Sequence, residues 1–264
     1  MLRKIVLIFI IFISPNILAE NNRIIIASTT STYDSGFFDY INQEFNKKYP
    51  INIHILSLGT GQAIEVAKNG DADILLVHHK PSELKFIQKE YGVKRHRLMY
   101  NDYILVGPKF DNDNCDTIKN TLQKIKDNKY IFISRGDNSG TNYKEKELWN
   151  SMQVDTGKIS SWYKEIGQGM GSTLNFANEI HAYTLTDRGS WLSFNNKDNL
   201  KIICEYKPNL INQYSIIAVN PKINPKINSQ DANIYVNWII SEEGKKLINN
   251  FKINNQQIFF FNHH

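Results

Sequence analysis

Buried strands alternate with helical segments through the first ninety residues, and this alternation constrains the fold more than any other feature of the sequence. Three apolar runs are each followed by a segment with helical spacing, in the order 23–27 and 36–49, 51–56 and 62–69, 73–77 and 81–91. Chains with this alternation form mostly parallel sheets covered by helices on both faces. The sequence therefore predicts an α/β fold.

Two similar strands divide the chain into two parts. The apolar runs 103–108 and 214–221 both end in Pro. Between them lie a further strand at 130–133 and a helix that begins after Ser139, and after them 230–251 has the apolar stripe of one long amphipathic helix. We expect two α/β lobes joined by two crossing strands, with these boundaries: a leader at 1–19, lobe I at 20–102 and 215–264, and an inserted lobe II at 103–214.

The first nineteen residues have the pattern of a secretory signal peptide. Arg3 and Lys4 precede an apolar run at 5–13, which is too short to span a membrane, and a cleavage point follows Ala19. No cysteine stands at this point to carry a lipid, so we expect a freely soluble protein exported to the periplasm. Loss of the leader lowers the formal charge of +5 by two, and so mild a charge does not indicate nucleic-acid binding.

Cys115 and Cys204 are the only cysteines of the chain. In an oxidising compartment such a pair can form a disulfide, and the sequence leaves open whether these two meet or remain separate small side chains. Their spacing is not the Cys-x-x-Cys of redox or zinc sites.

The segment 133–141, Ile-Ser-Arg-Gly-Asp-Asn-Ser-Gly-Thr, has the composition of an anion-binding turn. It joins a predicted strand to a predicted helix, and the first N–H groups of a helix attract anions. Ser139 and Thr141 add hydroxyl donors, and Gly140 allows the backbone to approach a ligand. Arg135 carries a fork of donors that matches an oxyanion.

A simpler interpretation is that Ser139 or Asp137 caps the helix and Arg135 pairs on the surface. If the segment does bind an anion, we expect Asp137 to orient Arg135 rather than to contact the anion, which its carboxylate would repel. Two more donor-rich turns, at 28–32 and 59–61, also follow strands and precede helices. Because such strand ends converge on the ligand crevice of open α/β folds, the three turns together favour a cleft for a small anion.

Six motifs occur in order over nearly all of the exported chain: 27–36 (ASTTSTYDSG), 59–63 (GTGQA), 73–78 (DILLVH), 134–141 (SRGDNSGT), 167–171 (GQGMG) and 182–189 (AYTLTDRG). Together they resemble the motifs of periplasmic tungstate-binding proteins of ABC importers. The resemblance implies a type II periplasmic binding protein fold whose lobes close on tungstate and deliver it to a permease with its ATPase subunit. It also implies a monomeric receptor without a cofactor, in which tungsten is present only as the bound oxyanion.

The same resemblance implies which residues contact the ligand. The strongest candidates are Thr30, Thr60, Arg135, Ser139, Gly140, Thr141 and Thr184, and the weaker ones are Thr29, Ser31 and Thr186. Gly169 and Met170 belong to a Gly-rich turn that either shapes the wall of the cleft or packs in the core.

The chemistry of the turns bears on which anion binds. Phosphate-binding proteins share the pattern Arg-x-Asp-x-Ser-Gly-Thr, so 135–141 indicates a tetrahedral oxyanion without naming it. Phosphate keeps a proton and benefits from a carboxylate acceptor, whereas sulfate, molybdate and tungstate only accept. The turns 28–32 and 59–62 contain no carboxylate, although Asp34 is close. Tungstate therefore rests on the resemblance, and molybdate, then phosphate or sulfate, remains the alternative.

Other classes of function fit the sequence less well. No histidine is placed by a recognisable local motif as a base for Ser139 or Thr141, and no Gly-x-Ser-x-Gly elbow occurs, so we do not expect an enzyme acting on an anionic substrate. The glycine-rich turns lack the spacing and the lysine of nucleotide-binding loops. The histidines, including His78 and His79, lack metal-ligand spacing, and we expect them on the surface or in the core and no metal site.

Overall fold

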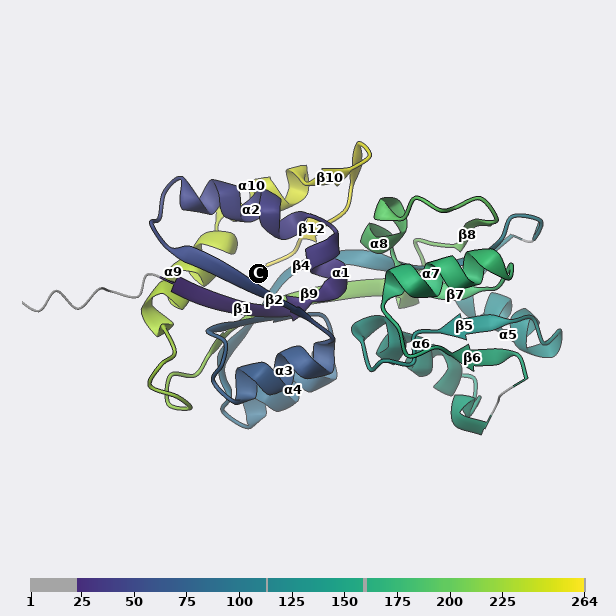
Figure 1. The fold of residues 1–264 in the computed structure, drawn as a ribbon, viewed down its shortest axis with the longest axis horizontal. Helices are drawn as coiled ribbons and strands as arrows, with labels where there is room; N and C mark the ends of the chain where they lie inside the picture. Colours follow the sequence, from purple (N-terminus) through teal and green to yellow (C-terminus); the bar gives the residue numbers. More distant parts are fainter. Residues whose placement is uncertain (1–22, 113, 159–160, 264) are drawn as a thin grey trace, which may run out of the picture.

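The computed structural model describes residues 23–112, 114–158 and 161–263. The expected leader at 1–19 lies outside these residues. Within them the elements gather into two lobes that lie side by side (Figure 1). No helix in the described part of the chain is long and apolar enough to cross a membrane.

Lobe I is built on one mixed sheet with helices on both faces. Its elements are β1 (Arg23–Thr29), α1 (Thr30–Asp34), α2 (Phe37–Asn46), β2 (Asn52–Leu58), α3 (Thr60–Lys68), β3 (Ile74–Val77), α4 (Lys80–Gln88), β4 (Gly92–Pro108), β9 (Ile211–Val219), α9 (Ser229–Ile239), α10 (Glu242–Asn250), β10 (Lys252–Ile253), β11 (Gln256–Gln257) and β12 (Phe260–Phe261). The main strands follow the order β12-β4-β9-β3-β1-β2. In this sheet β1 pairs in parallel with β2 and β3, whereas β9 runs antiparallel to both β3 and β4. The expectation of a mostly parallel sheet was therefore wrong.

Lobe II is smaller and contains the predicted anion-binding turn at 133–141. Its elements are α5 (Ile118–Asp127), β5 (Phe132–Ser134), α6 (Gly140–Asn150), a 3-10 turn (Thr156–Lys158), β6 (Tyr163–Glu165), α7 (Met170–Glu179), β7 (Thr184–Asp187), α8 (Arg188–Ser193), β8 (Leu200–Cys204) and a second 3-10 turn (Pro208–Leu210). β5 and β6 pair in parallel, and β7 and β8 both pair with the end of β4. Cys115 and Cys204 form a disulfide that ties the segment before α5 to β8, with their Cα atoms 5.2 Å apart.

β4 passes from lobe I into lobe II. Its residues from Gly92 to Asp102 pair with β9, and from Tyr103 onward they pair with β7 and then β8. The sequence predicted only the second half of this strand. The first half was missed because Lys94 and Arg97 are exposed charged residues, so the segment lacks an apolar run.

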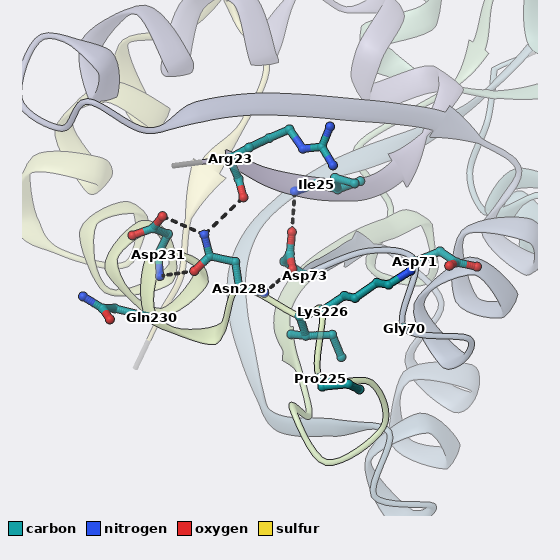
Figure 2. A pocket seen from close by; sticks show the side chains of 11 residues that line it. Arg23, Ile25, Gly70, Asp71, Asp73, Pro225, Lys226, Asn228, Gln230 and Asp231 are labelled. Carbon is teal, nitrogen blue, oxygen red and sulfur yellow. Dashed lines mark hydrogen bonds between the residues drawn. The ribbon is translucent and has the colours of Figure 1, made fainter. Parts of the chain in front are cut away.

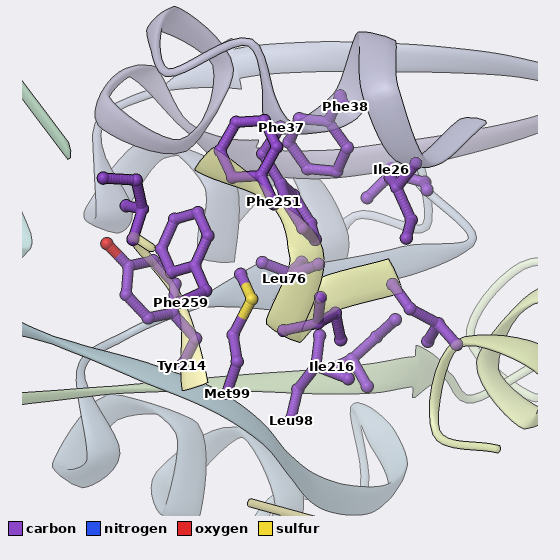
Figure 3. Packing of buried hydrophobic residues seen from close by; sticks show 14 of the residues in the cluster. Ile26, Phe37, Phe38, Leu76, Leu98, Met99, Tyr214, Ile216, Phe251 and Phe259 are labelled. Carbon is purple, nitrogen blue, oxygen red and sulfur yellow. The ribbon is translucent and has the colours of Figure 1, made fainter. Parts of the chain in front are cut away.

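Aromatic side chains from distant parts of the chain pack on the upper face of the lobe I sheet (Figure 3). Phe37 of α2 meets Phe251 and Phe259 edge to face, with ring centroids 5.5 and 5.1 Å apart. These rings cover Leu76 of β3 and Ile216 of β9, which are fully buried. The C-terminal segment therefore completes the core that begins at α2, and fixes β1 and β3 beneath it.

The predicted long helix at 230–251 is instead two helices, α9 and α10. Ser241 begins the second one, because its Oγ accepts a hydrogen bond from the Gly244 N–H at 3.4 Å. Gly244 permits the tight junction, since a Cβ there would lie 2.0 Å from the carbonyl oxygen of Ile239. The apolar stripe continues across the break, which is why periodicity alone did not reveal it.

We expect Ser241→Ala to lower the free energy of unfolding by about 1 kcal/mol, because the first turn of α10 loses its side-chain acceptor. Urea unfolding of the protein measures this loss as a lower midpoint with an unchanged slope. Ser241→Thr keeps both the capping acceptor and the hydroxyl that donates to the Trp238 carbonyl at 2.6 Å, and it should unfold close to the wild type. Equal loss in both variants would contradict a capping role.

Candidate anion-binding site

Three turns rich in hydrogen-bond donors meet where the two lobes face each other. In lobe I they are 29–30 between β1 and α1, and 59–60 between β2 and α3; in lobe II it is 135–141 between β5 and α6. Each turn follows the carboxyl end of a strand and leads into a helix. Because α/β folds bring such ends together, residues far apart in the chain line one small enclosed pocket.

The enclosed pocket takes its lining from both lobes. Lobe I contributes Thr29, Thr30, Ser31, Leu58, Gly59, Thr60 and His78, and lobe II contributes Arg135, Ser139, Gly140 and Thr141. The structure thus brings together every candidate that the sequence named for these turns. Among the described residues that line this pocket there is no carboxylate.

Two hydroxyl groups face the pocket from opposite lobes without a partner. Thr60 is fully buried and Thr141 is 1% exposed, and neither Oγ1 has a hydrogen-bond partner among the described residues. A buried hydroxyl left in this way costs roughly 1–3 kcal/mol. A ligand that accepts hydrogen bonds in the pocket would satisfy both groups at once.

Arg135 brings the positive charge of the site. Its side chain is almost fully buried, and its Nε and Nη2 donate to Asp137 Oδ2 at 3.1 and 2.6 Å. The other oxygen of Asp137 accepts from the Ser139 N–H at 3.1 Å. Asp137 therefore orients Arg135, as the sequence predicted, and the guanidinium keeps further N–H donors for a ligand.

The first turn of α6 presents backbone donors to the same pocket. Ser139 is the N-cap, and its Oγ accepts from the Asn142 N–H at 3.2 Å. Gly140 and Thr141 are the first helical residues, whose N–H groups have no partner within the helix. The two interpretations of this segment are compatible, because Ser139 caps the helix and also lines the pocket.

The turn after β1 holds its hydroxyls in an internal network. Thr29 Oγ1 lies 2.8 Å from Thr32 Oγ1 and 3.3 Å from Ser31 Oγ. Ser28 Oγ donates to the Leu76 carbonyl at 2.7 Å, which ties the turn to β3. Thr30 is half-buried and faces the cleft.

Thr184 and Thr186 do not line the pocket. The Thr184 Oγ1 donates to the Ile133 carbonyl at 2.7 Å, and the Thr186 Oγ1 donates to the Asp187 carbonyl at 3.2 Å. Both residues lie in β7, and the Thr184 bond holds β7 beside β5, whereas the Thr186 bond stays within β7. The structure gives both hydroxyls backbone partners, in contrast to those of Thr60 and Thr141.

His78 lines the enclosed pocket, although the sequence placed it among surface or core histidines. Its Nδ1 lies 3.0 Å from the Tyr103 hydroxyl, and its ring lies 4.7 Å from the Tyr214 ring. Burial lowers the pKa of the His78 imidazole to about 4, and the Arg135 charge adds to this effect. One sequence signal could have found it, since His78 directly follows β3 as the donor turns follow β1 and β2.

A wider hollow opens beside the enclosed pocket, and its lining is more mixed. It adds three carboxylates, Asp34, Glu65 and Asp137, and an apolar wall at Met170, which also belongs to the core. Burial raises the pKa of Asp34, Asp187 raises it further, and Arg135 opposes both. The carboxylates therefore lie around the entrance rather than in the enclosed part.

The two lobes touch beside the pocket. The His79 ring stacks on Tyr143 of α6 at 4.3 Å, and a Cβ placed on Gly140 would lie only 2.3–2.9 Å from three atoms of the His78 ring. Both histidines belong to lobe I and both partners to lobe II. The lobes are therefore closed in this structure.

Another hollow lies at the opposite ends of β1 and β3 (Figure 2). There the Asp73 carboxylate accepts from the N–H groups of Ile25 and Asn228, both at 2.7 Å. Asn228 Nδ2 in turn donates to Asp231 at 2.7 Å and to the Arg23 carbonyl at 3.2 Å. These bonds join β1, β3 and the start of α9, so the polar groups of this hollow stabilise the fold.

Comparison with known proteins adds independent findings. A family model described as a PBP superfamily domain matches residues 17–243. A protein of Peptoclostridium acidaminophilum named tungstate-binding protein TupA is 43% identical over 233 residues, 86% of this chain and 81% of the relative. The solved tungstate-binding protein TupA from Desulfovibrio alaskensis G20 has a TM-score of 0.81 at 38% identity, covering 92% of this chain and 99% of that one. A structure titled as the tungstate ABC transporter from Geobacter sulfurreducens gives 0.79 at 39% identity, covering 87% and 98%.

Proposed function

The chain belongs to the tungstate-binding family of the PBP superfamily, and on this basis we propose that it captures tungstate between its two lobes and delivers it to an ABC-type importer. It acts as a binding protein and not as an enzyme, since its relatives carry the names of binding and transport proteins. Its fold is the type II periplasmic binding fold of two α/β lobes.

The observation that carries this proposal is the pair of unpartnered hydroxyls, Thr60 and Thr141, at one pocket with Arg135. A tetrahedral dianion accepts hydrogen bonds in several directions, which suits donors that arrive from two lobes. We therefore propose Thr30, Thr60, Arg135 and the first turn of α6, 139–141, as its ligands. Thr184 and Thr186 support the site through β7 instead.

The donor set also bears on the anion. Because the described lining of the enclosed pocket includes no carboxylate, it favours an anion that carries no proton of its own. This favours tungstate, molybdate and sulfate over phosphate. The choice of tungstate over molybdate rests on the relatives, and molybdate, then phosphate or sulfate, is the alternative.

Closure of the two lobes would signal to the permease that an anion is bound. Donors from both lobes reach the same anion only when the lobes are together, so the anion stabilises the closed form over the open one. We propose that the closed form, as a monomer, docks on the permease, which works with an ATPase subunit. We also propose that lobe I comprises 20–102 and 215–264 and lobe II 103–214, and that a signal peptide at 1–19 directs the chain to the periplasm.

Calorimetric titration of the protein, stripped of bound anion, tests the function directly. We expect one tight site for tungstate, weaker binding of molybdate and no measurable binding of phosphate or sulfate. Tight binding of phosphate or sulfate without tungstate would contradict the assigned anion. No binding of any of the four would overturn the receptor function itself.

A further inference from the structure

His78 occupies an unusual position among the donors of the enclosed pocket. It follows β3 of lobe I, and its side chain is buried beside Arg135, Ser139 and Gly140 of lobe II. In the described lining it is the one imidazole, and Arg135 is the one side chain with a fixed positive charge. Its protonation would therefore change the charge of the pocket itself.

The imidazole is held in place from three directions. The Tyr103 hydroxyl of β4 lies 3.0 Å from Nδ1, and the Tyr214 ring of β9 lies against the imidazole at 4.7 Å. Gly140 of α6 covers it from lobe II, so closely that a Cβ would overlap the ring. A ring fixed in this way stays beside the first turn of α6, where the anion would bind.

The charges around the pocket leave a dianion incompletely balanced. The positive charge of Arg135 is paired with Asp137 at 2.6 Å, so the pair together brings little net charge. Two further carboxylates act nearby, because Asp34 lines the wider hollow and Asp187 raises the pKa of both the Tyr103 and the Tyr214 phenol. A protonated His78 would supply the missing positive charge within the pocket.

The groups that face His78 decide when it takes up a proton. Tyr103 and Tyr214 remain neutral, because burial holds the pKa of each phenol well above its usual range. Arg135 and His79 both oppose a charge on His78, as does burial. A hydrogen bond with the Asn212 side chain raises the pKa of His78, but burial outweighs it and keeps the imidazole neutral in the pocket without an anion. A bound dianion would add a second effect that raises this pKa.

Resting on the proposed function, we propose that His78 is a further recognition residue, which takes up one proton from solvent when a tetrahedral dianion binds and so favours divalent over monovalent anions. The sign follows from linkage. Binding raises the pKa of His78 from about 4, so affinity increases as the pH falls through the pKa of the bound state. At pH values well above that point the imidazole is neutral in both states and the affinity no longer depends on it.

Proton uptake can be counted directly. We expect calorimetric titration with micromolar sodium tungstate, in buffers of different ionisation enthalpy, to show uptake of at least about 0.7 proton per site at pH 6.0 and less at pH 8.0. The affinity should be at least about threefold tighter at the lower pH. In His78→Gln both the uptake and the pH dependence should be lost. His79→Gln, which alters the neighbouring imidazole, should keep both.

Perrhenate provides a second probe, because it is a tetrahedral oxyanion with one negative charge fewer. We expect the ratio of tungstate to perrhenate affinity at pH 6.0 to fall at least about threefold in His78→Gln. A purely structural role of His78 would weaken both anions alike and leave this ratio unchanged.

The outcomes separate this inference from the function on which it rests. Tungstate binding by the wild type without proton uptake between pH 6.0 and 8.0 would overturn the role of His78 and leave the receptor function intact. Uptake that persists in His78→Gln would do the same. A wild type that does not bind tungstate would overturn the function itself, and the wild-type titration decides even if the variant fails to fold.

Discussion

Replacing Arg135 with alanine is expected to weaken tungstate binding by about 2–5 kcal/mol, which is at least about thirtyfold in the dissociation constant. The guanidinium is 3% exposed and lines the enclosed pocket, so its bonds to an anion form away from water. Asp137 forms an ion pair with Arg135, so removal of the guanidinium also leaves an uncompensated carboxylate near the anion. Loss of attraction and new repulsion act in the same direction.

Titration calorimetry of Arg135→Ala against the wild type measures this loss. Arg97→Ala is the matched control, because Arg97 is exposed on β4 and bonds to Gln213 outside the pocket. Arg135→Lys should fall between wild type and alanine, since it keeps the charge but loses the planar fork. Unchanged tungstate affinity in Arg135→Ala would contradict the assignment of this pocket as the binding site.

The parts of the fold that the sequence predicted are those with a clear local pattern. β3 is entirely apolar and buried, β1 has an apolar run at 24–27, and α6 begins after Ser139 as the capping residue indicated. The donor turns were also predictable, because three turns rich in hydroxyl and glycine residues each follow a buried strand and precede a helix. Their meeting at one pocket followed from the general rule for strand ends in α/β folds.

The parts that were missed depend on contacts between distant residues. The first half of β4 is a strand because it pairs with β9, more than a hundred residues later in the chain, and its exposed charges conceal this. The break at Ser241 depends on how Gly244 packs against the end of α9. Thr184 carries the same hydroxyl as Thr60, and only the Ile133 carbonyl in the neighbouring strand distinguishes their roles.

The position of His78 in the pocket also depends on contacts with residues that are distant in the sequence. Its position directly after β3 matches that of the donor turns after β1 and β2, but a histidine at such a position also occurs on the surface or in the core. Its role emerges from Tyr103, Tyr214 and Gly140, which the fold brings to it from three other elements. Gly140 was likewise predicted for close approach of the backbone to a ligand, and the structure adds that it also allows close approach of the other lobe.

Gly140→Ala is expected to weaken tungstate binding by about 1–3 kcal/mol, roughly five- to 150-fold, while the stability of the protein changes little. The added Cβ would lie 2.3 Å from Cε1 of His78, and that ring cannot retreat because Tyr103 and Tyr214 hold it from behind. Alanine is otherwise well suited to the first turn of a helix, so lobe II itself should fold normally. The overlap arises only when the lobes close, and the cost therefore falls on the closed form that binds the anion.

Calorimetry with tungstate and thermal unfolding of the protein without anion separate these two effects. Gly171→Ala is the matched control, because Gly171 lies in the first turn of α7 beside the same cleft and a Cβ there would meet nothing within 4 Å. It should bind as the wild type does. The double variant Gly140→Ala/His78→Ala removes the ring that the new methyl group meets, so it should bind more tightly than the two single losses combined would predict. Equal affinity in Gly140→Ala and the wild type would mean that anion binding does not require the contact between His78 and α6, and losses that simply add would mean that the methyl group acts on something other than His78.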